Sequence, residues 1–108
     1  MAAIAEIGPV ELKRRLDAGE KLTLLDVREP WEVAIARIPG SLHIPLGEVP
    51  QRLGELDSGT PLVVMCKVGG RSLRAAQFLA SRGFSDVANL SGGIDAWAQE
   101  VDPGVPMY

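Results

Sequence analysis

The sequence predicts an α/β fold in which a parallel sheet is covered by helices on both faces. Short apolar runs alternate with segments of helical periodicity along the chain, and this alternation is typical of parallel sheets. The segment 61–65 carries no charge and is rich in apolar residues, as expected of a strand buried on both faces. The 108 residues are 46% hydrophobic and 23% charged, which suits one domain with a real core. We therefore expect a single domain over residues 1–108.

The first half of the chain contains three expected strands, at 3–7, 22–27 and 41–44. A helix follows the first strand, because Gly8 can cap it, Pro9 suits the first helical position and Glu11 stands where a capping-box carboxylate belongs. Further helices are expected over 32–36 and, more weakly, over 48–56.

The second half contains the clearest strand, at 61–65, and a last strand at 87–90. A helix over 72–82 places Leu73, Ala76 and Ala80 on one face, and Gly83 ends it. A final helix is expected over 94–99, followed by a proline-rich, extended tail.

Bulk charge and cysteine content exclude several classes of protein. A formal net charge of -3 and a pI of about 5.1 give no electrostatic reason to bind nucleic acid or a membrane surface. No apolar run approaches the roughly 18 residues needed to span a bilayer, and the start lacks the pattern of a signal peptide, so we expect a cytoplasmic protein. The single cysteine excludes an intrachain disulfide and a multi-cysteine metal site.

Cys66 is the residue with the strongest chemical signal. It ends the most apolar strand, where ligands bind in open α/β sheets, and a glycine loop and a helix follow it. Gly69 and Gly70 can adopt positive φ and turn consecutive backbone N–H groups toward one point, at which the helix also directs its positive end. Arg71 and Lys67 add positive charge, and all these features favour the nucleophilic thiolate. The alternative is a buried, inert cysteine that precedes an ordinary turn between a strand and a helix. A turn of that kind does not need two glycines and two cations around the thiol.

Four motifs stand in order along the chain: Leu-Leu-Asp-Val-Arg-Glu-Pro-Trp-Glu at 24–32, Ile-Pro-Gly-Ser at 38–41, Cys-Lys-Val-Gly-Gly-Arg-Ser at 66–72 and Leu-Ser-Gly-Gly-Ile-Asp-Ala-Trp at 90–97. Together they resemble the motifs of the rhodanese superfamily. The resemblance implies a five-stranded parallel sheet with helices on both faces. It also implies a sulfurtransferase without a cofactor or metal, in which Cys66 is catalytic. Cys66 would take the outer sulfur of a donor such as thiosulfate as a persulfide and pass it to cyanide in vitro, or to a thiol or protein in the cell.

The resemblance also assigns roles around Cys66. It implies an active-site or substrate-binding loop made of Lys67, Val68, Gly69, Gly70, Arg71 and Ser72. Asp26 would help to organise the site and Arg28 would tie loops together, although a structural salt bridge explains these two residues equally well. Arg71 would orient the loop through carboxylate contacts, with some part in binding an anionic donor.

Two other functions are compatible with this fold. Phosphatases and arsenate reductases of related architecture have a loop longer by one residue, which widens the ring of N–H groups for a tetrahedral oxyanion. Here four residues separate Cys66 from Arg71, and no second cysteine can resolve an oxidised intermediate. A non-enzymatic interaction module is the third interpretation, but inactive relatives usually lose the cysteine that this chain keeps.

Departures from the family pattern indicate which sulfur donor to expect, and the tail indicates which acceptor. Ala36-Arg37 stand where relatives often have Gly-His, and Val68 replaces a small polar residue, which makes the mouth more apolar and favours a protein persulfide over thiosulfate. The tail at 98–108 is similar to the end of the rhodanese domain in bacterial adenylyltransferase–sulfurtransferase fusions, whose acceptors are ubiquitin-like sulfur carriers.

Three other side chains have simpler interpretations. We expect His43, the only histidine, to be a satisfied or surface residue, and Trp31 and Trp97 to pack in or beside the core.

Overall fold

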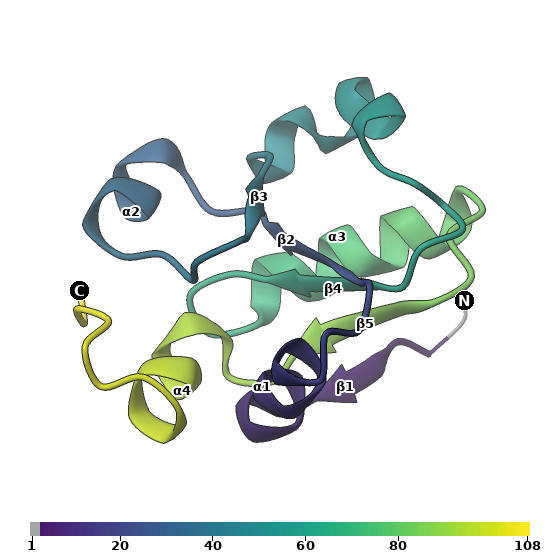
Figure 1. The fold of residues 1–108 in the computed structure, drawn as a ribbon. Coiled ribbons are helices and arrows are strands. Elements are labelled where there is room, and N and C mark those ends of the chain that lie inside the picture. The colour runs from purple at the N-terminus through teal and green to yellow at the C-terminus, as the bar shows by residue number, and fades with distance from the viewer. Residues whose placement is uncertain (1–2) are drawn as a thin grey trace.

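The computed structural model describes residues 3–108 and contains a five-stranded sheet in which every neighbouring pair of strands is parallel (Figure 1). The strand order is β1-β5-β4-β2-β3. The strands, in chain order, are β1 (Ala5–Ile7), β2 (Thr23–Asp26), β3 (Leu42–His43), β4 (Leu62–Met65) and β5 (Val87–Leu90). The predicted fold class is therefore confirmed.

Helices cover both faces of this sheet. One face carries α1 (Pro9–Asp17) and α4 (Gly93–Glu100), which contact each other, and the other carries α3 (Gly70–Ser81) and η1 (Leu46–Glu55), a 3-10 segment. The short helix α2 (Pro30–Ile35) lies beyond the carboxyl end of β2, on the side where the C-terminus also lies (Figure 1).

Two hydrophobic cores follow from the alternation of side chains along the central strands. Successive residues of a strand point to opposite faces, so Val63 packs with α1 and α4 while Val64 packs with α3. Met65 continues the first core and Cys66 belongs to the second. Cys66 is therefore held at the edge of a packed core, on the α3 face, where its side chain cannot move freely.

The carboxyl ends of β2, β4 and β5 meet at one edge of the sheet. Asp26 at the end of β2 lies beside Met65 of β4, and Asn89 of β5 lies beside Val64. The segments after Asp26, Met65 and Leu90 therefore leave the same edge of the sheet, which is the edge where ligands bind in open parallel sheets. No helix within residues 3–108 is long and apolar enough to cross a membrane.

Several local predictions need correction. α2 begins at Pro30 instead of residue 32, because Glu29 and Glu32 form a reciprocal capping box that starts the helix earlier. α3 begins at Gly70 instead of residue 72. The segment predicted as a weak helix is a 3-10 helix with a non-helical residue at Arg52, and Glu11 bonds to Arg14 without capping α1.

Candidate active site

Cys66 is the first residue after β4, and its side chain lies under the loop that leads into α3. Only 1% of the residue is exposed. The backbone N–H of Gly69 donates to Cys66 Sγ at 3.1 Å, and the Ser72 hydroxyl lies 3.3 Å from the same sulfur. The sulfur therefore sits where polar hydrogens of the loop and of the first turn of α3 converge.

The loop owes this shape to a small number of glycines. Gly69 precedes α3 with a φ of +113°, a region that side chains rarely adopt, and its carbonyl accepts the N–H of Leu73. Gly70, for which we also expected a positive φ, is instead the first residue of the helix and does not have one. One left-handed residue is therefore enough to turn the loop amides back toward the sulfur.

The start of α4 fastens the same loop from behind. The N–H groups of Ile94 and Asp95 donate to the carbonyl oxygens of Cys66 and Lys67 at 2.9 and 3.1 Å. Gly93 has a φ of +59°, and a Cβ at this position would collide with both carbonyl oxygens. The double glycine at residues 92–93 thus allows the helix to approach the backbone of the cysteine loop.

Hydrogen bonding outweighs burial in setting the charge of Cys66. Burial on its own raises the pKa of the thiol, but the Ser72 hydroxyl and the backbone N–H groups of Ser72, Gly69 and Val68 stabilise the thiolate. Together they lower the pKa of Cys66 below its usual value. A buried thiol with a lowered pKa is the environment of a nucleophile, whereas a purely structural cysteine would have a raised pKa.

Arg71 is directed away from the sulfur and toward α2. Its guanidinium binds both carboxylate oxygens of the buried Glu32, at 2.6 and 3.0 Å. This contact holds the pKa of Glu32 at about 2, against the desolvation that burial causes, with help from the Glu29 N–H and the Tyr108 hydroxyl. The bidentate pair joins the cysteine loop to α2.

Sequence reasoning did not single out Glu32, although the capping-box pattern at residues 29–32 was a usable signal. The position is buried, and a buried carboxylate at the third position of a helix needs a cation. Because the partner lies on another element, the sequence alone could not identify Arg71 as that cation.

Asp26 and Arg28 form a fully buried ion pair behind α2. Arg28 Nη2 lies 2.6 Å from Asp26 Oδ2 and also donates to the Ala36 carbonyl at 2.7 Å. The hydroxyl of Tyr108 accepts from Arg28 Nη1 at 2.9 Å and donates to Glu32 at 2.7 Å. Arg28 thus connects β2, the end of α2 and the C-terminal segment.

His43 has a structural partner near this pair. Its Nε2 lies 2.7 Å from the carbonyl oxygen of Arg28, so it is a satisfied histidine, as expected.

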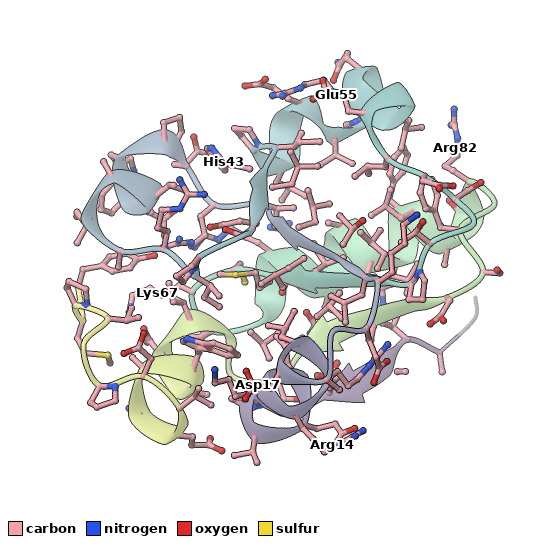
Figure 2. The ribbon with its side chains drawn as sticks, viewed as in Figure 1. Arg14, Asp17, His43, Glu55, Lys67 and Arg82 are labelled. Atoms are coloured by element: carbon pink, nitrogen blue, oxygen red, sulfur yellow. The ribbon has the colours of Figure 1, made fainter. Side chains whose placement is uncertain are left out.

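Lys67 does not contribute a charge directed at the sulfur, which corrects the sequence-based picture. Its ammonium lies 2.8 Å from Asp95 Oδ2 and 4.8 Å from the centre of the Tyr108 ring. Figure 2 shows Lys67 on the side of α4 and the C-terminal segment. The side chain therefore braces the loop against α4 instead of polarising Cys66.

Exposed apolar side chains lie on the segments around the loop. Val68 is 63% exposed, Met107 is 54% exposed and Trp31 is 61% exposed. The prediction that Trp31 packs in or beside the core is wrong: its ring makes an edge-on contact with Tyr108, with 5.8 Å between ring centres. Trp97 is buried, as predicted. Both cations of the loop are paired, while Val68 at its tip is apolar and open to solvent.

The described part of the chain, residues 3–108, has no group of three or more His, Cys, Asp or Glu side chains placed to hold a metal ion. The chemistry that this site supports is that of a single thiolate in a ring of hydrogen-bond donors. A parallel α/β domain with such a cysteine at the carboxyl end of a central strand defines a class of small cysteine-dependent transferases and hydrolases.

Comparison with known proteins identifies the family within this class. The family model described as "Rhodanese-like domain" matches residues 8–100, so the chain belongs to the rhodanese-like family. The putative sulfurtransferase YtwF of Bacillus subtilis is 40% identical over 100 residues, which cover 93% of this chain and 96% of YtwF. The probable adenylyltransferase/sulfurtransferase MoeZ of Mycobacterium tuberculosis is 41% identical over 104 residues, but these cover only 26% of MoeZ.

The solved structures agree with this assignment. A rhodanese-like domain protein from Staphylococcus aureus superposes with a TM-score of 0.85 at 28% identity, over 97% of this chain and 99% of that protein. The chain is thus similar in full length to single-domain relatives and to one part of larger fusions. The family is that of rhodanese-like sulfurtransferases, as the sequence motifs predicted.

Proposed function

We propose that the chain is a sulfurtransferase that carries a sulfane sulfur on Cys66. In the first step the Cys66 thiolate attacks the outer sulfur of a donor. With thiosulfate, the S–S bond of the donor breaks, sulfite leaves with the electron pair, and Cys66 becomes a persulfide anion. In the second step a nucleophilic acceptor attacks the terminal sulfur, and Cys66 leaves as a thiolate.

The observation that carries this proposal is the convergence of hydrogen-bond donors on Cys66 Sγ. The Gly69 N–H is held by the loop 3.1 Å from the sulfur, and the Ser72 oxygen lies 3.3 Å from it, where its hydroxyl can donate to a thiolate. Donors held this close stabilise an anionic sulfur in a buried site. They favour the thiolate both as the nucleophile of the first step and as the leaving group of the second.

Arg71 supports this function as a positioning residue. Its guanidinium is occupied by Glu32 in a bidentate contact, so it holds the loop against α2 and leaves little capacity to bind a free anion. Its positive charge still interacts with Cys66, and this interaction favours the thiolate. Asp26 and Arg28 are proposed to act indirectly, by fixing the positions of α2 and of the Tyr108 side chain.

The surface around the loop favours a donor larger than thiosulfate. Val68, Trp31 and Met107 present apolar surface, and the ammonium of Lys67 is paired with Asp95. A dianion such as thiosulfate finds little uncompensated positive charge there, whereas a protein-bound persulfide can use the apolar surface. We therefore propose that a protein persulfide is the better donor and that a thiol or a ubiquitin-like sulfur-carrier protein is the acceptor.

Intact-protein mass spectrometry tests the proposal directly, because Cys66 is the only cysteine of the chain. Incubation with thiosulfate or with a protein persulfide is expected to add the mass of one sulfur atom, and cyanide is expected to remove it with formation of thiocyanate. The Cys66→Ser variant should neither gain the mass nor form thiocyanate. An unchanged mass of the wild-type protein with every donor would contradict the proposal.

A further inference from the structure

The buried amide of Asn89 lies close to Cys66 and makes hydrogen bonds to the residues around it. Asn89 is on β5, beside Val64 in the sheet, and is therefore on the same face as Cys66. Its Nδ2 donates to the Gly69 carbonyl at 3.2 Å and to the Glu6 carboxylate at 3.1 Å. Both contacts are acceptors, so they fix the amide with its oxygen toward Ser72.

The Ser72 hydroxyl has one hydrogen and three acceptors within reach, the most distant oxygen being the Gly69 carbonyl at 3.2 Å, which already accepts from Leu73 and Asn89. Its oxygen lies 2.5 Å from Asn89 Oδ1 and 3.3 Å from Cys66 Sγ. A serine hydroxyl donates one hydrogen bond at a time, although it accepts others. The short contact to Asn89 indicates where the hydrogen rests when the sulfur carries no charge, since an ionised acceptor is needed to attract it more strongly.

We propose that Asn89 is a positioning residue that sets the direction of the Ser72 hydroxyl. The hydroxyl donates to Asn89 Oδ1 while Sγ is uncharged, and it rotates to donate to Sγ when Cys66 is a thiolate. No covalent bond changes in this rotation. The proposal rests on the proposed function only in taking Cys66 as the reacting sulfur.

The cost of the rotation falls on Asn89. When the hydroxyl turns to the thiolate, Oδ1 loses its hydrogen bond inside the protein, and an unsatisfied buried acceptor is unfavourable. Asn89 thus competes with the sulfur and keeps the thiolate less stable than the Ser72 hydroxyl alone would make it. A thiolate that is not too stable remains a strong nucleophile toward a sulfur donor.

The other charged groups near the sulfur have partners of their own, so they do not explain a competition for the Ser72 hydroxyl. The cations of the loop are each paired with a carboxylate: Arg71 with Glu32, and Lys67 with Asp95. From β2, Asp26 and Arg28 also form a pair, and the His43 ring of β3 is bonded to a carbonyl. Glu6 of β1 reaches the site only through Asn89 and also accepts from Ser91.

The pH dependence of Cys66 alkylation by iodoacetamide tests this role and needs no sulfur donor. We expect Asn89→Leu to lower the pKa of Cys66 by about one unit, that is by about 1.4 kcal/mol, because the hydroxyl then loses its nearest competing acceptor and keeps only the more distant Gly69 carbonyl beside the sulfur. Ser72→Ala is expected to raise the pKa. In the Ser72→Ala background the added Asn89→Leu substitution should change nothing, because its effect passes through the hydroxyl.

Glu6→Gln is a second variant, which we expect to fold normally because Glu6 is exposed and glutamine keeps an acceptor oxygen for Asn89 and Ser91. The variant removes the negative charge that polarises the Asn89 amide, so Asn89 Oδ1 becomes a weaker acceptor. We expect the pKa of Cys66 to fall, but by less than in Asn89→Leu. The part of this shift that passes through the hydroxyl should be absent in the Ser72→Ala background. Ser81→Ala is the matched control, because Ser81 lies on the same helix and also bonds a carbonyl but is far from the sulfur. It should leave the pKa unchanged.

Three results would overturn the proposal. A raised or unchanged pKa in Asn89→Leu would show that the amide braces the loop without competing for the hydroxyl. A shift of the same size with and without Ser72 would show that Asn89 acts through another route. A Glu6→Gln shift of the same size with and without the hydroxyl would show that Glu6 acts on the sulfur only as a distant charge, and that the Asn89 amide does not set the direction of the hydroxyl. If the wild-type protein transferred no sulfur, this would contradict the proposed function. The pKa differences between the variants would still test the role of Asn89.

Discussion

The ion pair between Arg71 and Glu32 makes a quantitative prediction about stability and pH. The pKa of Glu32 falls from 4.5 to about 2 in the folded protein, mainly through its bidentate contact with Arg71. At about 1.4 kcal/mol per pKa unit, ionised Glu32 is linked to about 3 kcal/mol of folding free energy. Because the pKa is lowered by folding, this contribution is complete above about pH 4.5 and is lost as the pH falls toward about 2.

The substitution Glu32→Gln tests this prediction by urea unfolding at several pH values. Gln keeps the size of the side chain and one acceptor oxygen but removes the charge, so we expect a loss of about 3 kcal/mol at pH 7. Below about pH 4.5 the wild-type protein should lose stability faster than the variant, and the two curves should converge. Equal free energies of unfolding at neutral pH, or parallel curves in acid, would refute the reasoning.

The remaining predictions concern Lys67, Gly93 and Tyr108. Lys67→Met should leave the pKa of Cys66 unchanged in alkylation experiments, because the ammonium is bound to Asp95. Gly93→Ala should cost more than about 2 kcal/mol in chemical unfolding, since the added Cβ combines a positive φ with a collision against two carbonyl oxygens. Tyr108→Phe should cost about 1–3 kcal/mol in the same assay, because the hydroxyl bonds to both Arg28 and Glu32.

Controls make these outcomes decisive. Gly47→Ala is matched to Gly93→Ala, because Gly47 has no positive φ and open space around its Cα, and it should change stability by only a few tenths of a kcal/mol. Similar losses for the two glycine variants would disprove the packing argument for α4. A raised pKa of Cys66 in Lys67→Met would restore Lys67 as an electrostatic partner of the sulfur. An unaltered stability of Tyr108→Phe would show that the C-terminal segment does not anchor α2.

Much of the fold could be predicted because its information is local. The strand at 62–65 is uncharged and lies between a proline and a glycine loop, and the last strand was predicted with its observed bounds. Pro30 was missed as the first residue of α2, although a proline suits the first helical position and Glu32 stands three residues after Glu29. In the structure the Glu29 N–H donates to the Glu32 carboxylate at 3.0 Å and starts the helix at Pro30. Helix boundaries depend on caps of this kind, which sequence periodicity does not show.

The cysteine and its loop could also be found from sequence, whereas the partners of the loop could not. Cys66 and the glycines after it are contiguous, so their meeting is dictated by the turn itself. Glu32 and Asn89 reach the loop from α2 and β5, and only the packed sheet brings them within hydrogen-bond distance. The pairing of Lys67 with Asp95 could not be predicted for the same reason, since Asp95 lies on α4.

Trp31 shows how an argument from residue type can fail at the surface. Aromatic residues bury large areas, and the default expectation for a tryptophan is the core. Here the ring follows Pro30 in a helix that projects beyond the sheet, and it remains 61% exposed while it contacts Tyr108.

The most direct test of the account is the ionisation of the wild-type Cys66 thiol, followed through its ultraviolet thiolate absorbance as the pH is varied. We expect an apparent pKa below the ordinary cysteine value of about 8.5, because loop amides and the Ser72 hydroxyl offset burial. A pKa at or above that value would mean that burial dominates, and the site would then lack the anion-stabilising property that the proposed sulfur transfer needs.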